Sequence, residues 1–90
     1  MVWRVELADS AAKQLRKLDP PIATRILTFL RDRVTSLDDP RSIGEALRGK
    51  DFGDFWKYRV GDWRIIADID DGVLLITVIR IGNRRDVYRR

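Results

Sequence analysis

One stretch decides the fold: residues 55–69 read FWKYRVGDWRIIADI. Apolar and polar side chains alternate on both sides of Gly61-Asp62, a pair typical of two-residue hairpin turns. Strands joined by such a turn have a fixed register, because a slip by one residue would exchange their faces. We therefore predict an antiparallel hairpin in which Val60 opposes Trp63, Arg59 opposes Arg64, Tyr58 opposes Ile65 and Lys57 opposes Ile66.

This register places Lys57, Arg59 and Arg64 on one face of the hairpin, opposite the face that carries the aromatic and aliphatic side chains. Two arginines directly across a ladder repel each other unless an anion lies over them. Asp68 shares the face but lies about 13 Å from Arg64 along the strand, too far to neutralise the pair. Solvated arginines that keep an edge soluble are the alternative. Three cations on one face favour an anion-binding site.

The flanking segments complete the predicted fold. Alternation over residues 3–7 predicts a first strand, and helical spacing predicts helices at about 9–18 and 21–37, the first capped by Asp9 or Ser10. A turn at residues 70–72 leads to an apolar strand over 73–81. The prediction is an α+β fold of order β-α-α-β-β-β, a four-stranded and mostly antiparallel sheet with a helical hairpin on one face. The length of the second turn decides whether Arg80 joins the core face or the basic one, and the pattern leaves this open.

Composition narrows the possible functions of this single domain, residues 1–90. The chain has 18 Lys and Arg against 14 Asp and Glu, a net charge of +4, and neither Cys nor His. Disulfides, common zinc sites and thiol chemistry are thereby excluded, so catalysis would rest on Lys, Arg, Tyr or carboxylates. We expect no cofactor and no metal. No signal peptide or membrane-length apolar run is visible, which predicts a cytoplasmic protein.

The charge is concentrated at the end of the chain. Residues 80–90 hold five arginines and one acid, Asp86, and so carry the whole net charge of +4. A basic tail on a neutral body favours a polyanion or an acidic protein as partner. A solvated tail without a partner is the alternative.

Two motifs resemble the RelE/ParE superfamily of toxin–antitoxin toxins. The first is LRG at residues 47–49 followed by FWKYRVGDWRII at 55–66, and the second is IRIGNRRDVY at 79–88. The close of the predicted first helix, LRKLD at 15–19, also fits. The resemblance covers essentially the whole chain. It implies a RelE-type mRNA interferase of a type II toxin–antitoxin pair, a ribosome-dependent endoribonuclease, with a RelB-like acidic antitoxin, the ribosome and mRNA as partners.

The resemblance also implies roles for single residues. Lys57 would donate a proton or stabilise charge, Arg59 and Arg64 would clamp the scissile phosphate, Arg84 would stabilise the transition state, and Tyr88 would contact the reacting nucleotide. The implied catalytic set is Lys57, Arg64, Arg84 and Tyr88, and the implied RNA- and phosphate-binding set is Arg48, Lys50, Arg59 and Arg85. Two positions depart from the family: Asn83 stands where many relatives carry His, and Phe55 where they carry a second lysine.

Elementary chemistry agrees with a metal-free ribonuclease. The 2′-hydroxyl of RNA can attack the adjacent phosphorus and leave a cyclic phosphate and a 5′-hydroxyl, whereas DNA lacks that hydroxyl. The reaction needs an in-line substrate and fixed cations around the phosphorus. Tyr88 is the candidate base, with a core anchor as its alternative role. A site this poor in acid–base groups predicts a weak enzyme unless the ribosome positions the RNA.

Two rival functions remain open. A ParE-like inhibitor of DNA gyrase would use the same fold without phosphate-clamping arginines or a terminal tyrosine. A catalytically silent member that binds only an antitoxin or nucleic acid is the second rival, and Asn83 and Phe55 favour it.

Overall fold

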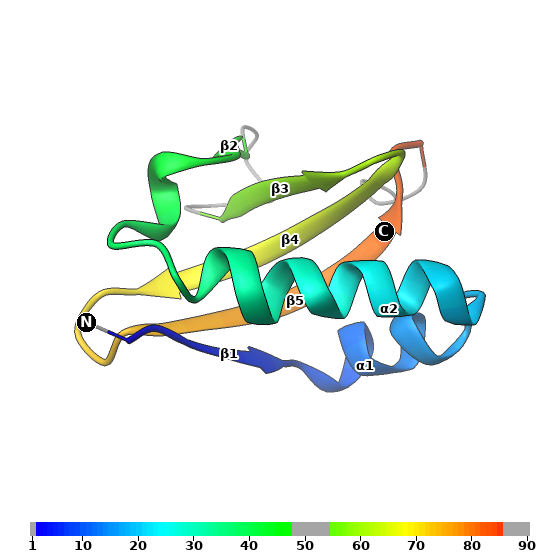
Figure 1. Cartoon of the computed structure of the whole chain (residues 1–90), viewed down its shortest axis with the longest axis horizontal. Helices are drawn as coiled ribbons and strands as arrows, with labels where there is room; N and C mark the ends of the chain where they lie inside the picture. The colour runs from blue at the N-terminus through cyan, green and yellow to red at the C-terminus, as the bar shows by residue number, and fades with distance from the viewer. Residues whose placement is uncertain (1, 48–54, 86–90) are drawn as a thin grey trace.

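The computed structural model describes residues 2–47 and 55–85, in the α+β class that the sequence predicts (Figure 1). The elements follow in the order β1 (Arg4–Leu7), α1 (Asp9–Arg16), α2 (Pro20–Thr28), the π-type turn η1 (Phe29–Val34), the 3-10 turn η2 (Pro40–Ser42), β2 (Glu45–Ala46), β3 (Trp56–Val60), β4 (Trp63–Asp70) and β5 (Leu75–Asn83).

The sheet has five strands in the order β1-β5-β4-β3-β2, so the predicted number of four is wrong. β1 runs parallel to β5, and the other neighbours are antiparallel. The additional strand, β2, pairs Glu45 with Lys57 and Ala46 with Trp56. It has only two residues, too few for an alternating pattern to be recognised in the sequence.

The predicted register of the β3–β4 hairpin is confirmed at every pair from Trp56 opposite Ala67 to Val60 opposite Trp63. Gly61 has a φ of 60°, a conformation that glycine adopts without steric cost. A Cβ atom added there would lie 3.1 Å from Nη1 of Arg25. Both the backbone conformation and the close approach of Arg25 therefore favour glycine at this position. The guanidinium of Arg25, from α2, lies over the turn of the hairpin.

The β4–β5 register settles the face of Arg80. Asp70 pairs with Leu75, so the turn spans residues 71–74, and the register shifts by one residue between Ile66 and Ala67. Ile79 is the extra residue of this bulge. Beyond the bulge Arg80 opposes Ile66, which also opposes Lys57, so Arg80 shares the face of Lys57. Neither turn length considered from the sequence included a bulge.

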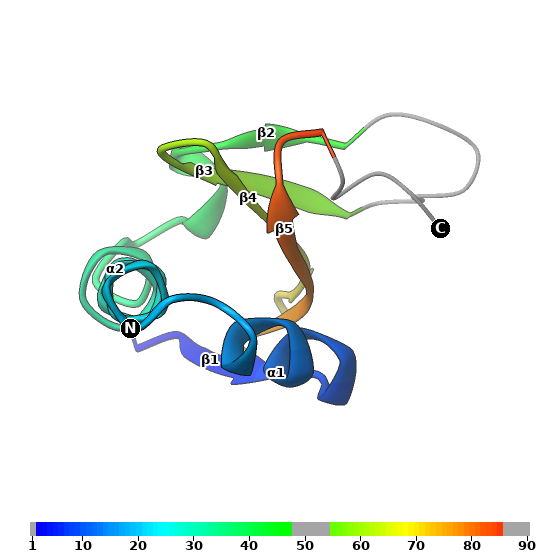
Figure 2. The same cartoon turned by 90° about the vertical axis from the view of Figure 1, so that its right-hand side faces the viewer.

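The core lies between the helices and the sheet, which curves around α2 from β3 to β1 (Figure 2). The predicted helical stripe is confirmed at Ile26, Leu30 and Val34, which are at most 2% exposed. The regular α-helix ends at Thr28 and continues as η1 to Val34, short of the predicted residue 37. Pro20 and Pro21 begin α2, where the missing N–H groups cost nothing.

α1 covers the edge of β5 beyond the end of β1. Ser10 Oγ donates a hydrogen bond to the Ile79 carbonyl at 2.8 Å, and Gln14 Oε1 accepts one from the Ile81 N–H at 2.7 Å. The predicted cap at Asp9 or Ser10 is wrong, because the residue at the cap is Ala8 and no side chain caps the helix. Ser10 satisfies the strand edge instead.

Tyr58 ties the segment around η2 to β3. Its side chain is completely buried, and its hydroxyl donates a 2.6 Å hydrogen bond to the Pro40 carbonyl. The Phe29 ring packs edge-on against it with 5.9 Å between centroids. Nearby, Trp56 Nε1 donates to the Ile43 carbonyl at 2.8 Å. Two aromatic side chains of β3 thus hold the link that carries β2.

We expect Tyr58→Phe to lower the free energy of unfolding by about 1–2 kcal/mol, because it leaves a buried carbonyl without its donor. Ser36→Ala is the matched control: its hydroxyl also donates to a carbonyl, that of Arg33, but at an exposed position. The control should change stability by less than about 0.5 kcal/mol. Urea unfolding measures both, and equal losses would contradict the anchoring role of Tyr58.

Burial raises the pKa of Tyr58 above its ordinary value. A neutral phenol that resists ionisation contributes stability below the unfolded pKa of about 10, and that contribution is lost as pH rises toward the folded pKa. We therefore expect the wild-type chain to lose more stability than Tyr58→Phe between about pH 9 and about pH 11. Urea unfolding at the two pH values checks this, and parallel losses in both proteins would refute it.

Candidate nucleic-acid interface

Four cations share the sheet face that points away from the helices: Lys57, Arg59, Arg64 and Arg80, called here the basic face. Lys57 and Arg80 lie on either side of Ile66, and Arg64 lies between Arg59 and Gly82. Neighbouring strands are about 4.8 Å apart, so the three strands spread these charges over about 10 Å. The predicted grouping of Lys57, Arg59 and Arg64 is confirmed, and Arg80 joins it.

Lys57 is not isolated on this face. Its Nζ lies 3.0 Å from Oε1 of Glu45, the residue directly opposite on β2. The Lys57 side chain is 18% exposed and that of Glu45 is 57% exposed. The ion pair holds the ammonium group of Lys57 in position on the face. β2, which the sequence did not reveal, therefore supplies the partner of a predicted site residue.

Arg64 is buried, with 7% of its surface exposed, although the sequence suggested a solvent-facing side chain. Its Nη1 donates to the carbonyls of Gly61 at 2.9 Å and Trp63 at 3.0 Å. No buried side-chain nitrogen lacks a partner within residues 2–47 and 55–85, so the other N–H groups of Arg64 reach the surface. The turn carbonyls therefore hold the guanidinium in place, and its remaining N–H groups can donate to a ligand.

The repulsion expected between Arg59 and Arg64 is relieved without an anion. The two residues do oppose each other. Arg64 folds back onto the turn carbonyls, whereas Arg59 is exposed and lines a groove toward α2 and η1. The opposed pair alone is therefore no proof of an anion site, and the clamp of both arginines on one phosphate stays a prediction.

An apolar cluster lies under the basic face, formed by Leu47, Phe55, Ile66 and Ile79. Ile66 is 1% exposed although it lies on the side without helices. Phe55 occupies the position of the family's second lysine and packs into this cluster. This cluster was not predicted from the sequence. Ile66 and the apolar run at residues 73–81 nevertheless indicated a pair of strands that is covered on both faces.

The chain reverses just after β5, where two predicted site residues follow. Arg84 and Arg85 are exposed; the Arg84 N–H bonds the Asp62 carbonyl at 2.8 Å, and Asn83 Oδ1 accepts from the Arg85 N–H at 3.1 Å. Gly82 lies within β5 opposite Arg64. The predicted site residues Arg48, Lys50 and Tyr88 lie outside the described residues.

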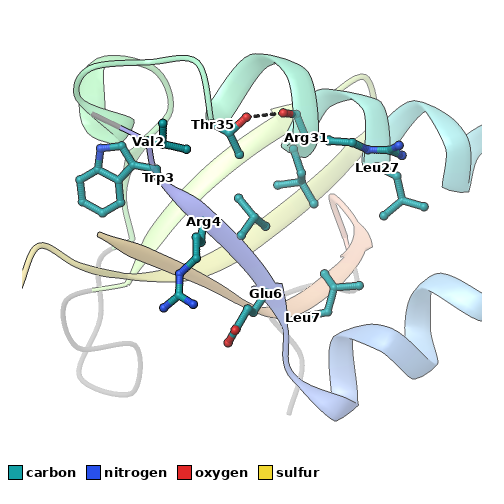
Figure 3. A pocket seen from close by; sticks show the side chains of 10 residues that line it. Val2, Trp3, Arg4, Glu6, Leu7, Leu27, Arg31 and Thr35 are labelled. Carbon is teal, nitrogen blue, oxygen red and sulfur yellow. Dashed lines mark hydrogen bonds between the residues drawn. The ribbon is translucent and has the colours of Figure 1, made fainter. Parts of the chain in front are cut away.

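Two grooves, neither of them predicted from the sequence, flank α2 and η1. The first, of about 590 Å³, lies between β1 and the helix and is lined largely by aliphatic side chains such as Val5, Leu27 and Leu30. Figure 3 shows Arg4 and Glu6 on the side of β1 away from the helix. The second, of about 550 Å³, lies between the helix and β3 and is lined by Arg25, Arg33 and Arg59. Within the described parts of the chain, no helix is both long and apolar enough to cross a membrane.

Comparison with known proteins identifies the family. Residues 5–88 match the family model described as the ParE toxin of the type II toxin–antitoxin system parDE. Toxin RelG of Mycobacterium tuberculosis is 30% identical over 90 residues, all of both chains. Toxin RelE of the same organism is 31% identical over 87 residues, 97% of this chain and 87% of the relative. The chain belongs to the ParE toxin family of type II toxin–antitoxin systems, within the RelE/ParE superfamily that its motifs resemble.

Solved structures support the same fold. The RelE–RelB complex of Pyrococcus horikoshii superposes with a TM-score of 0.74 at 27% identity, over 96% of this chain and 99% of the relative. The RelBE2 toxin–antitoxin complex of Mycobacterium tuberculosis gives a TM-score of 0.83 at 24% identity, over 93% of this chain and 100% of the relative. The latter likeness is evidence for the fold alone.

We expect Arg64→Ala to lower the free energy of unfolding by about 1–3 kcal/mol, since it removes a charged donor from two carbonyls at the turn. Arg59→Ala, at the exposed position directly opposite, should change stability by less than about 0.5 kcal/mol. Urea unfolding of both variants measures the difference. If Arg64→Ala is as stable as Arg59→Ala, the turn does not depend on this guanidinium.

Proposed function

We propose that this chain is the toxin of a type II pair and acts as a ribosome-dependent endoribonuclease that cleaves mRNA and so inhibits translation. One observation carries the proposal: Lys57, Arg59, Arg64 and Arg80 come from three strands to one face, with Arg84 just beyond its edge. Clustered base on one face is the electrostatic signature of a nucleic-acid partner.

The residues of this face suit cleavage of RNA by its own 2′-hydroxyl. In that reaction a base takes the proton of the 2′-hydroxyl, the hydroxyl oxygen bonds to phosphorus, and the 5′-oxygen leaves and takes up a proton. Negative charge grows on the phosphoryl oxygens along the way. Arg64 supplies a fixed guanidinium opposite Gly82, and a preorganised cation stabilises developing charge without moving. Lys57, held in place by its ion pair with Glu45, is suited to stabilise charge or to donate the proton to the leaving oxygen.

Arg59 and Arg84 complete the proposed contacts with phosphate. Both are exposed and lie on the two flanks of Arg64, one on β3 and the other after β5. Arginine forks bind phosphate oxygens with two donors each. Tyr88 is proposed as the contact to the reacting nucleotide, and Arg48, Lys50 and Arg85 as further contacts to the RNA backbone. Their chemistry alone supports these four assignments.

A protein antitoxin is the proposed partner that controls this activity. The structural relatives from Pyrococcus horikoshii and Mycobacterium tuberculosis are both complexes of a toxin with its antitoxin. The net charge of +4 favours an acidic segment in such a partner. The ribosome is proposed as the second partner, because the basic face offers cations for positioning but few groups for acid–base catalysis.

A gyrase-binding inhibitor is the second candidate, favoured by the ParE description of the matching family model. Two features of the site also favour the gyrase-binding candidate over the nuclease. Phe55 packs into the apolar cluster where a lysine would add charge, and Lys57 has an acidic neighbour at 3.0 Å. The nuclease remains the better-supported function, because binding gyrase would not require guanidinium groups gathered on one face of the sheet.

The test is cell-free translation with added protein, followed by mapping of message ends and a DNA supercoiling assay on the same preparation. We expect cuts in ribosome-bound message that leave 5′-hydroxyl ends, with no effect on supercoiling. Lys57→Ala should slow cleavage about 100-fold, since one fixed charge at the phosphate is lost. Arg16→Ala, which removes an exposed cation on α1, is the matched control and should cut at the wild-type rate.

Inhibited supercoiling with intact message would establish the gyrase-binding candidate. Intact message and normal supercoiling together would point to the silent member of the family. Full cleavage by Lys57→Ala would remove that lysine from the site while leaving the nuclease assignment in place.

A further inference from the structure

β1 forms one end of the sheet, and in the described part of the chain no strand lies beyond its outer edge (Figure 1). The Arg4 N–H bonds the Leu74 carbonyl at 3.0 Å, and the Ala8 N–H bonds the Val78 carbonyl at 2.8 Å. Backbone groups point alternately to the two sides of a strand, so the N–H and C=O of Val5 point away from β5. The outer edge of β1 therefore offers the donors and acceptors of an unpaired strand.

The side chains along this edge separate into a charged face and an apolar face. Arg4 and Glu6 are exposed and lie on the side away from the helix, whereas Val5 lines the aliphatic groove between β1 and α2 (Figure 3). Within the described residues, neither Arg4 nor Glu6 has an ion-pair partner. Val2, just before the strand, is 77% exposed and lines the same groove. The edge thus presents two opposite charges on one face and apolar surface on the other.

The order of base, apolar residue and acid at Arg4-Val5-Glu6 is complementary to itself in an antiparallel pair. With Val5 of one copy opposite Val5 of another, each Arg4 opposes a Glu6. The two Val5 residues then exchange both backbone hydrogen bonds, and the opposed charges occupy the position where facing side chains are closest. A shift of two residues in either direction would place Arg4 opposite Arg4 or Glu6 opposite Glu6. Backbone direction and charge therefore select one register.

We propose that the outer edge of β1 is a self-association surface, through which two copies of this chain pair antiparallel with Val5 at the two-fold axis. The interface is isologous, because each contact occurs twice. The axis runs perpendicular to the sheet, so the two sheets join with their helices on one side and their basic faces on the other. Val2 of each copy lies opposite Ala8 of its partner, which reduces the exposure of that apolar side chain.

A second copy fits this edge better than RNA does. An RNA backbone has no N–H and C=O groups to continue the ladder, and its phosphates would meet the carboxylate of Glu6. Strand edges that avoid self-pairing commonly carry like charges, a proline or a bulge, and β1 has none of these. The strand has only four residues, so the buried area is small and the dimer should form and dissociate with protein concentration.

The first test reverses one charge at a time in the full chain. Arg4→Glu and Glu6→Arg each convert two opposite-charge pairs into two like-charge pairs, and each should weaken the dimer about tenfold. Mixed in equal amounts, the two variants should form a heterodimer of wild-type affinity, because every pair between them again has opposite charges. Arg33→Glu, an exposed change in the groove beside β3, is the matched control and should dimerise like wild type. Sedimentation velocity over a range of concentrations measures association, and native mass spectrometry identifies which copies pair.

The second test addresses the backbone of the edge. Val5→Pro removes the outward N–H but leaves the bonds to β5, and outer strands tolerate proline where the N–H faces solvent. We expect the dimer to weaken about tenfold, since both central N–H donors are lost. Val5→Thr keeps the N–H and the branched side chain, and it should dimerise like wild type.

A wild-type chain that stays monomeric up to its solubility limit would overturn the proposal. Single charge variants that dimerise as well as wild type, or that fail to pair when mixed, would overturn it too, as would equal dimerisation of the two Val5 variants. Heterodimers in the mixture show that both charge variants are folded, so a folding defect does not imitate the expected result. None of the changed residues belongs to the basic face, and the result is therefore independent of the proposed nuclease.

Discussion

The Gly61-Asp62 turn holds β3 and β4 in the register on which the basic face depends. With Val60 opposite Trp63, every second residue of the hairpin faces the helices, and the cations between them face away. A shift of one residue would bury Lys57 and Arg59 under α2 and expose the aromatic side chains of the core. Arg64 reinforces the same turn from the side chain, because its Nη1 bonds the carbonyls of Gly61 and Trp63.

The opposed arginines then separate into different roles. Arg64 becomes a fixed cation at the centre of the face, whereas Arg59 also lines the groove between α2, η1 and β3. Like charges across a ladder destabilise it when both side chains are held close together. Here Arg64 donates to backbone carbonyls, and Arg59 is exposed to solvent. The hairpin can therefore carry positive charge before any partner arrives.

Sequence patterns predicted the features that depend on local rules. The hairpin register followed from alternation around one glycine turn, and the buried stripe of α2 and η1 followed from helical spacing. The motifs of residues 47–66 and 79–88 predicted the family that the comparisons identify. The grouping of Lys57, Arg59 and Arg64 followed directly from the register.

Features set by tertiary contacts could not be predicted in this way. β2 is too short for a pattern and forms because Tyr58 and Trp56 hold the preceding link against β3. The bulge at Ile79 that turns Arg80 onto the basic face has no glycine or proline to mark it. Ser10 bonds the β5 edge, where helix rules alone suggested a cap. The burial of Arg64 depends on carbonyls that only the folded turn presents.

The central claim is that RNA binds the face made by β3, β4 and β5. Titration of the labelled protein with a 2′-O-methyl oligoribonucleotide, which cannot be cleaved, tests it most directly through backbone amide chemical shifts. We expect the largest shifts at Lys57, Arg59, Arg64 and Gly82, with little change in α1 or along β1. Shifts confined to the helices or to the groove beside β1, with those four residues unmoved, would contradict the account.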